Sequence, residues 1–66
     1  MQITLNGEPF ELPGELSIAA LLDSLKIDSR RVAVELNLTV LKRGAFDQTM
    51  VREGDEVEIV NFVGGG

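Results

Sequence analysis

The segment MQITLNGEPFELPGELSIAALLDSL, residues 1–25, decides the fold of this chain. Residues 1–5 alternate apolar and polar side chains, and Asn6-Gly7 then supplies a dipeptide that tolerates positive φ at both central positions of a type I′ turn. Residues 8–12 are the expected return strand, in which Pro9 lacks an amide hydrogen and therefore favours a strand start or a sheet edge. A β-hairpin is thus predicted at the start of the chain.

An amphipathic helix is predicted directly after the hairpin. Pro13-Gly14 ends the second strand, and Ser17 is a residue type that often caps a helix N-terminus. Apolar side chains then recur at the i, i+3, i+4, i+7 spacing of a helix face, at Ile18, Leu21, Leu22 and Leu25. Because such a stripe is typical of a core face, we expect this helix to pack on a sheet.

Two or three further strands are expected after the helix. Residues 31–37 and 56–63 have the pattern of strands, and residues 40–42 favour a short additional one. Residues 45–50 are compatible with a helical turn or with a loop. The order of hairpin, helix and strands predicts a single α+β domain in which a mixed sheet of four to five strands wraps around one main helix.

The last predicted strand changes its pattern near its end. Strict alternation points Val57 and Ile59 inward, but the outward register then includes Val60 and Phe62. Two large apolar side chains on the solvent face would mark a docking surface. Alternatively, a bulge or the curvature of the sheet turns Phe62 back into the core.

The composition of the chain restricts its chemistry. The 66 residues contain no Cys and no His, so disulfides and Cys/His metal sites are excluded, and the usual general base and nucleophile are missing. We therefore expect no metal, no bound cofactor and no enzyme activity. The net charge of −5 disfavours nucleic acid and anionic membranes. With no apolar run long enough to span a membrane and no signal peptide, a cytoplasmic protein is expected.

The sequence ends in Gly64-Gly65-Gly66, immediately after the last predicted strand. Glycines have little side-chain surface to pack and lose the most backbone entropy on ordering, so we expect a domain over residues 1–63 and a flexible tail over residues 64–66. Without Cβ atoms such a tail fits a narrow channel, and a partner using ATP would convert its carboxylate to an acyl-adenylate. The alternative is an incidental frayed end.

The ending REGDEVEIVNFVGGG, residues 52–66, resembles the sulfur carrier of bacterial thiamine biosynthesis, the ThiS family. The hairpin with Asn6-Gly7, the Leu-rich residues 18–25 and residues 31–37 extend this resemblance over essentially the whole chain. It implies a ubiquitin-like β-grasp fold and a role as co-substrate. A ThiF-type, ubiquitin-activating-like enzyme would adenylate Gly66, sulfur from an enzyme persulfide would replace AMP, and the thiocarboxylate would supply sulfur to a ThiG-type thiazole synthase.

The resemblance also assigns roles to the end of the chain. Gly66 would be the modified residue, Gly64 and Gly65 the arm, and the partner-binding residues would be Val60, Phe62 and Val63.

Two positions depart from the family pattern. Leu38 follows Asn37 where family members commonly have Gly, which predicts another geometry for that turn, and Asn61 stands where many have His.

Three other functions remain open at this point. The small subunit of molybdopterin synthase has a similar fold and also ends in Gly-Gly, but those chains usually are longer and carry more aromatic residues than the three Phe here. A ubiquitin-like protein modifier would use the same activated carboxylate to become attached to lysine side chains of other proteins. A plain β-grasp binding module would make the glycines incidental.

Overall fold

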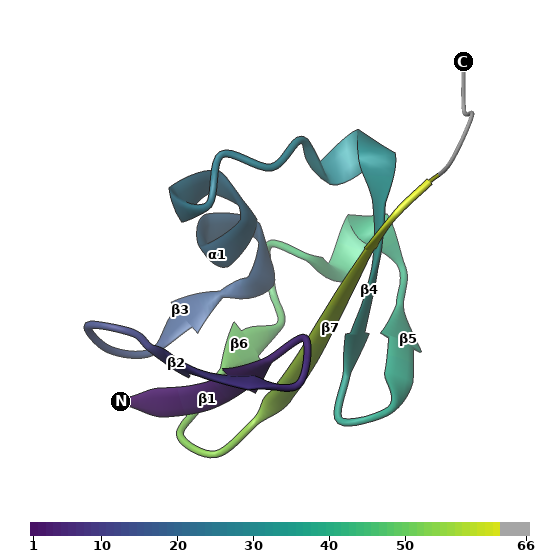
Figure 1. Ribbon diagram of the computed structural model, residues 1–66. Helices are drawn as coiled ribbons and strands as arrows, with labels where there is room; N and C mark the ends of the chain where they lie inside the picture. The colour runs from purple at the N-terminus through teal and green to yellow at the C-terminus, as the bar shows by residue number, and fades with distance from the viewer. Residues whose placement is uncertain (63–66) are drawn as a thin grey trace.

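The structure is a computed structural model that describes residues 1–62 and shows one layer of sheet with a helix packed across it (Figure 1). The predictions for Val63, for Gly64–Gly66 and for a domain boundary at residue 63 lie outside the described residues. The elements in chain order are β1 (Gln2–Leu5), β2 (Glu8–Glu11), β3 (Leu16–Ser17), α1 (Ile18–Ser24), the 3-10 helix η1 (Ser29–Arg31), β4 (Val32–Leu36), β5 (Thr39–Leu41), the 3-10 helix η2 (Arg43–Ala45), β6 (Met50–Val51) and β7 (Glu56–Asn61).

The main sheet is mixed and has five strands in the order β2-β1-β7-β4-β5. Strands β1 and β7 run parallel, with Thr4 opposite Glu56, whereas the other neighbours run antiparallel. The last strand therefore lies in the middle of the sheet, between the first strand and β4. This arrangement confirms the predicted α+β architecture and places the end of β7 beside β4, because β1 pairs only with the start of β7.

The predicted helix begins and packs as expected. The Oγ of Ser17 accepts a hydrogen bond from the N–H of Ala20 at 3.0 Å, so Ser17 is the N-cap. The stripe residues Ile18 and Leu21 are 0% exposed and Leu22 is 1% exposed. They pack on the sheet in one core cluster, whose other members are Ile3, Leu12, Val32, Val34, Phe46, Val51 and Val57.

A second, two-stranded sheet was not predicted. It pairs β3 with β6, and each of these strands has two residues, too few to leave a periodic signal in the sequence. The open question over residues 45–50 is settled in favour of a loop, because the 3-10 helix η2 ends at Ala45, residues 46–48 form a turn and Met50 begins β6. This segment supports the start of α1, because Ile18 N–H donates to the carbonyl of Thr49 at 2.8 Å and Phe46 is 3% exposed.

The turn between β4 and β5 corrects one prediction. Asn37 and Leu38 have φ of 51° and 71°, the same left-handed region that Asn6 and Gly7 adopt, so the expectation of another geometry was wrong. The side chain of Asn37 explains the outcome. Its Oδ1 accepts from Glu56 N–H at 2.9 Å, and its Nδ2 donates to Asp55 at 3.2 Å, which anchors the turn whatever residue follows.

Leu38 carries the cost of this geometry, since a residue with a Cβ is strained at positive φ. Replacing Leu38 by Gly is expected to raise the free energy of unfolding by about 1 kcal/mol, measured by urea denaturation. Leu38→Ala is the matched control, because it removes the same side chain, which is 82% exposed, but keeps the strain. A Gly variant no more stable than the Ala variant would contradict this explanation.

Candidate functional site

The chain leaves the sheet beside the junction of η1 and β4. Asn61 is the last residue of β7 and pairs with Val32. The N–H of Phe62 then donates to the carbonyl of Arg31 at 2.9 Å, which continues the antiparallel pairing one residue past the strand. This hydrogen bond fixes the position from which the remaining residues depart.

The end of β7 carries an exposed apolar face. Val60 is 56% exposed and Phe62 is 60% exposed, so of the two alternatives for Phe62 the exposed one holds. Val60 pairs with Ala33 and Val40 pairs with Glu35, two positions that share one face of β4. Val40, itself 67% exposed, therefore joins Val60 on the outer face of the sheet. The sequence could have revealed Val40, because alternation along the predicted strand 40–42 points this side chain outward.

A shallow groove adjoins Phe62, with a volume of about 320 Å³. Its apolar lining comes from β4, β5 and the segment after η2, and two guanidinium side chains complete it. The lining residues are Arg30, Val32, Ala33, Val40, Leu41, Arg43, Phe46 and Phe62. The groove therefore combines apolar and cationic surface at the point where the chain leaves the sheet.

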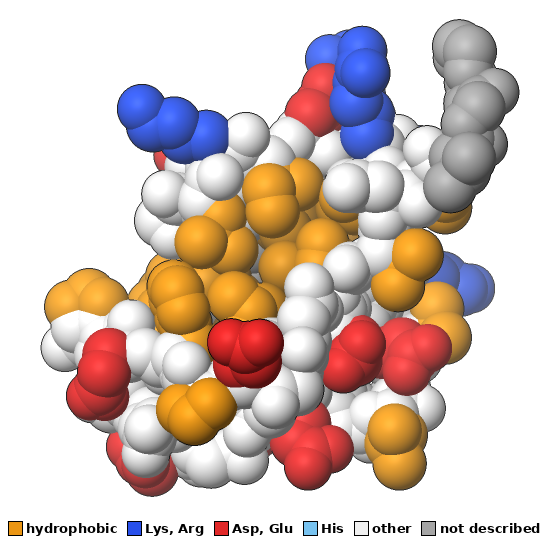
Figure 2. Space-filling model, viewed as in Figure 1, with side chains coloured by type: hydrophobic (Ala, Val, Ile, Leu, Met, Phe, Trp, Pro, Cys, Tyr) orange, Lys and Arg blue, Asp and Glu red, His pale blue; other side chains and the backbone are white. Residues whose placement is uncertain are grey.

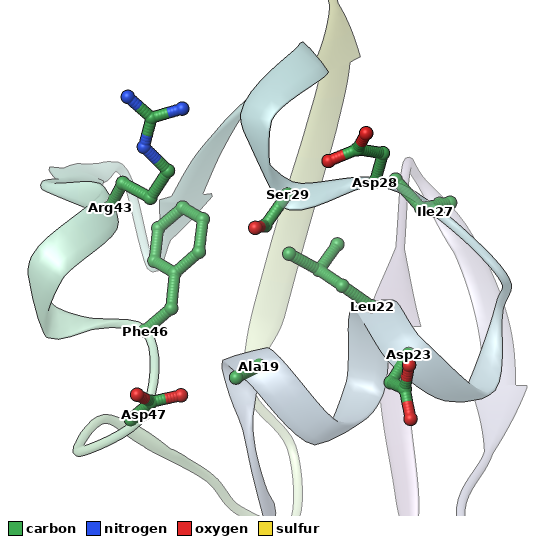
Figure 3. A pocket seen from close by; sticks show the side chains of 9 residues that line it. All are labelled: Ala19, Leu22, Asp23, Ile27, Asp28, Ser29, Arg43, Phe46 and Asp47. Carbon is green, nitrogen blue, oxygen red and sulfur yellow. The ribbon is translucent and has the colours of Figure 1, made fainter.

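A second hollow, of about 440 Å³, lies between α1, η1 and η2 (Figure 3). Its lining residues are Ala19, Leu22, Asp23, Ile27, Asp28, Ser29, Arg43, Phe46 and Asp47. The guanidinium of Arg43 is directed away from Ala19 and Leu22, out of the hollow. Over residues 1–62, no group of three or more His, Cys, Asp or Glu residues could hold a metal ion.

Asp28 forms ion pairs with two of the cations near the site. Its Oδ2 lies 3.0 Å from Nη2 of Arg30 and 3.8 Å from Nε of Arg31. The side-chain hydrogen bond from Arg30, reinforced by the backbone N–H of the same residue, lowers the pKa of Asp28 from 3.8 to about 2. Asp28 is therefore ionised throughout the physiological pH range. Because the pair is exposed, its contribution to stability is small.

The predicted roles of Val63, Gly64, Gly65 and Gly66 stay predictions, because these residues lie beyond residue 62. Val60 and Phe62 are brought together with Val40 at one end of the sheet. A docking role for them also stays a prediction. No helix in the described part of the chain is long and apolar enough to cross a membrane.

A mixed five-stranded sheet wrapped around one helix, with the last strand at its centre, is the ubiquitin-like β-grasp fold. Within this class, the ThiS family model matches residues 3–66. The chain therefore belongs to the ThiS family.

Two solved structures are closely similar to the chain. A crystal structure of the thiamine biosynthesis protein (ThiS) from Geobacter metallireducens shares 46% identity over 100% of both chains, with a TM-score of 0.88. A solution structure of a thiamine biosynthesis protein from the same organism also shares 46% identity. The match covers 100% of this chain and 88% of that one, with a TM-score of 0.83.

Two curated relatives are similar to this chain over its whole length but differ greatly in their own length. A thiazole synthase of Paramagnetospirillum magneticum is 42% identical over all 66 residues, but the chain spans only 20% of that protein. An uncharacterized protein, ycf40, of Porphyra purpurea is also 42% identical, and the chain spans 93% of it. A segment similar to this chain thus occurs within a thiazole synthase as well as in a protein of similar size.

Proposed function

We propose that this chain is a sulfur carrier of thiamine biosynthesis that bears its sulfur as a thiocarboxylate on Gly66. The observation that carries the proposal is the similarity, over the whole chain, to a fifth of a thiazole synthase. In a polypeptide that contains both a carrier and a synthase, the sulfur would be held close to the enzyme that uses it. Membership of the ThiS family supports the same assignment.

The proposed chemistry has three steps. A carboxylate oxygen of Gly66 attacks the α-phosphorus of ATP on an activating enzyme, and pyrophosphate leaves. The terminal sulfur of a persulfide enzyme then attacks the carbonyl carbon of the acyl-adenylate, and AMP leaves. A thiol cleaves the resulting S–S bond, so that the terminal sulfur stays on Gly66 and the donor cysteine ends in a disulfide with that thiol.

The carrier presents its C-terminal carboxylate to partner enzymes, and those enzymes carry out the catalysis. It has no Cys and no His to act as nucleophile or general base near neutral pH, so partner enzymes supply these groups and the ATP. Gly64 and Gly65 lack Cβ atoms and let a narrow channel admit the tail. The exposed Val60 and Phe62 beside the tail would bind the rim of such a channel.

Reconstitution with partners separates this function from its rivals. The loaded chain, mixed with thiazole synthase and the other thiazole precursors, is expected to support thiazole formation. Mixed instead with the large subunit of molybdopterin synthase, it should give no molybdopterin. Molybdopterin formation without thiazole formation, or conjugates to lysines in place of a free thiocarboxylate, would reject the proposal in favour of one of these rivals.

Replacing Phe62 by Asp is expected to weaken binding to the activating enzyme about tenfold, because a charge would enter the apolar part of the contact. The melting temperature should hardly change, since Phe62 is 60% exposed. Titration calorimetry with the enzyme measures the first effect and thermal denaturation the second. Leu38→Asp, at an 82% exposed site in the β4–β5 turn, is the matched control and should bind normally. Equal weakening by both variants would contradict a specific role for Phe62.

A further inference from the structure

Charge is unevenly distributed over this acidic protein. Of its six basic residues, four belong to two short segments next to the end of β7, and we call them the basic collar: Arg30, Arg31, Lys42 and Arg43. Figure 2 shows blue side chains in two groups at the upper end of the molecule and in a third at its right side, and most of the red ones over its lower half. A chain with a net charge of −5 thus has a cationic end.

The collar lies around the point where the chain leaves the sheet. Arg30 and Arg43 line the same groove as Phe62, although they come from η1 and η2. The backbone carbonyl of Arg31 accepts the N–H of Phe62 at 2.9 Å. The fold therefore brings Arg30, Arg31 and Arg43 from two separate segments to the base of the tail, and Lys42 precedes Arg43 in the sequence.

The collar is available to a partner. The side chains of Arg30 and Arg31 are 78% and 83% exposed, and Lys42 and Arg43 are exposed as well. Asp28 neutralises one charge through its paired hydrogen bonds with Arg30. Four cations and Asp28 carry a formal charge of +3, and Asp23 and Asp47, which line the adjoining hollow with Arg43, reduce this excess without reversing it, so the surface fits an anionic partner.

The carboxylates near the start of β7 accentuate this polarity. Glu53 accepts a hydrogen bond from Gln2 N–H, and Asp55 contacts Asn37, so both lie at the opposite end of the central strand from Phe62. Glu56 begins that strand. A partner approaching the tail meets positive charge, whereas one approaching the other end of β7 meets negative charge.

We propose that the basic collar docks on acidic side chains at the mouth of the channel through which the activating enzyme receives the tail. This inference rests on the proposed function. From Phe62 to Gly66 an extended chain spans at most about 14 Å, so the collar stays outside while the carboxylate reaches ATP. At that distance from the end of the tail, the arginine side chains of the collar would face the rim of the channel. Each guanidinium can bind a carboxylate there through a pair of hydrogen bonds.

Electrostatics favours the activating enzyme as the partner of the collar. The carboxylate of Gly66, the carrier as a whole and ATP are all negative, so their approach is repulsive. A cationic surface facing an acidic rim offsets this repulsion, accelerates association and orients the tail toward the channel. Such an effect acts on binding and weakens with salt, but it leaves the chemical step unchanged.

Two double variants with equal net charge test the collar. Arg31→Gln with Arg43→Gln removes two collar cations and keeps Arg30, which is bonded to Asp28. Lys26→Gln with Arg52→Gln removes the two cations outside the collar. Exchange of labelled pyrophosphate into ATP by the activating enzyme is measured against carrier concentration, at low and at physiological salt, with circular dichroism confirming that each variant is folded.

The collar variant is expected to raise KM for the carrier about tenfold at low salt with kcat unchanged, and to lose most of the salt dependence of the wild type. The control variant should remain within about twofold of wild type. Equal changes in both variants would show an effect of net charge alone and would overturn the inference, as would no change in either. Absence of exchange with the wild-type carrier would overturn the proposed function itself, and this inference with it.

Discussion

Deleting Gly65 and Gly66 is expected to abolish adenylation of the chain and sulfur transfer from it, while the unfolding transition stays unchanged. The reacting carboxylate would then belong to Gly64, two residues closer to the folded body, and could no longer reach ATP. The core cluster of the described residues is built from side chains between Ile3 and Val57. Pyrophosphate exchange measures the loss, and thermal denaturation checks the fold.

A finer variant separates length from chemistry. Gly66→Ala keeps the length of the tail but adds a Cβ next to the reacting carbon, so we expect a reduced rate of adenylation with an unchanged melting temperature. Gly14→Ala is the matched control, because a Cβ at Gly14 would meet nothing within 4 Å. If the chain without Gly65 and Gly66 were still adenylated and still supported thiazole formation, the assignment of Gly66 would be wrong.

Replacing Leu21 by Ala is expected to lower the free energy of unfolding by about 2–5 kcal/mol, because the side chain is 0% exposed and leaves a cavity. A domain of this size has a total stability of roughly 3–10 kcal/mol. The loss is therefore a large share of the total stability, and the midpoint of unfolding should fall clearly. Urea denaturation, with thermal denaturation as a second probe, measures the change.

Leu38→Ala is the matched control for this variant. It makes the same chemical change at a residue that is 82% exposed, and it keeps the backbone strain of the wild type. We expect a change within about 0.5 kcal/mol. If the two substitutions destabilised the chain equally, packing of the leucine stripe on the sheet would not be what holds the fold together.

The parts of the fold with strong local signals were predictable. Asn6-Gly7 fixed the first turn, and Ser17 with the stripe from Ile18 fixed the start and the buried face of α1. The pair β3 and β6 was missed because two-residue strands carry no period. Leu38 misled because the geometry of its turn depends on hydrogen bonds from Asn37 to Glu56 and Asp55, which are distant in sequence.

The candidate site was predictable in its apolar part. Alternation along the last strand pointed Val60 and Phe62 outward but left burial of Phe62 open, and the structure has both side chains exposed. The basic collar was not found, because Arg30 and Arg43 belong to segments that come together only when β4 pairs with β5. Charge clusters built from separate segments have no local sequence pattern, so the sheet pairing had to be known first.

Intact-mass spectrometry tests the central claim most directly. The chain is incubated with ATP, the activating enzyme, a persulfide sulfur donor and a thiol reductant. We expect its mass to rise by the difference between one sulfur and one oxygen, with fragmentation placing the change on Gly66. An unchanged mass under conditions in which the enzyme binds the chain, or a mass change located elsewhere, would contradict the account.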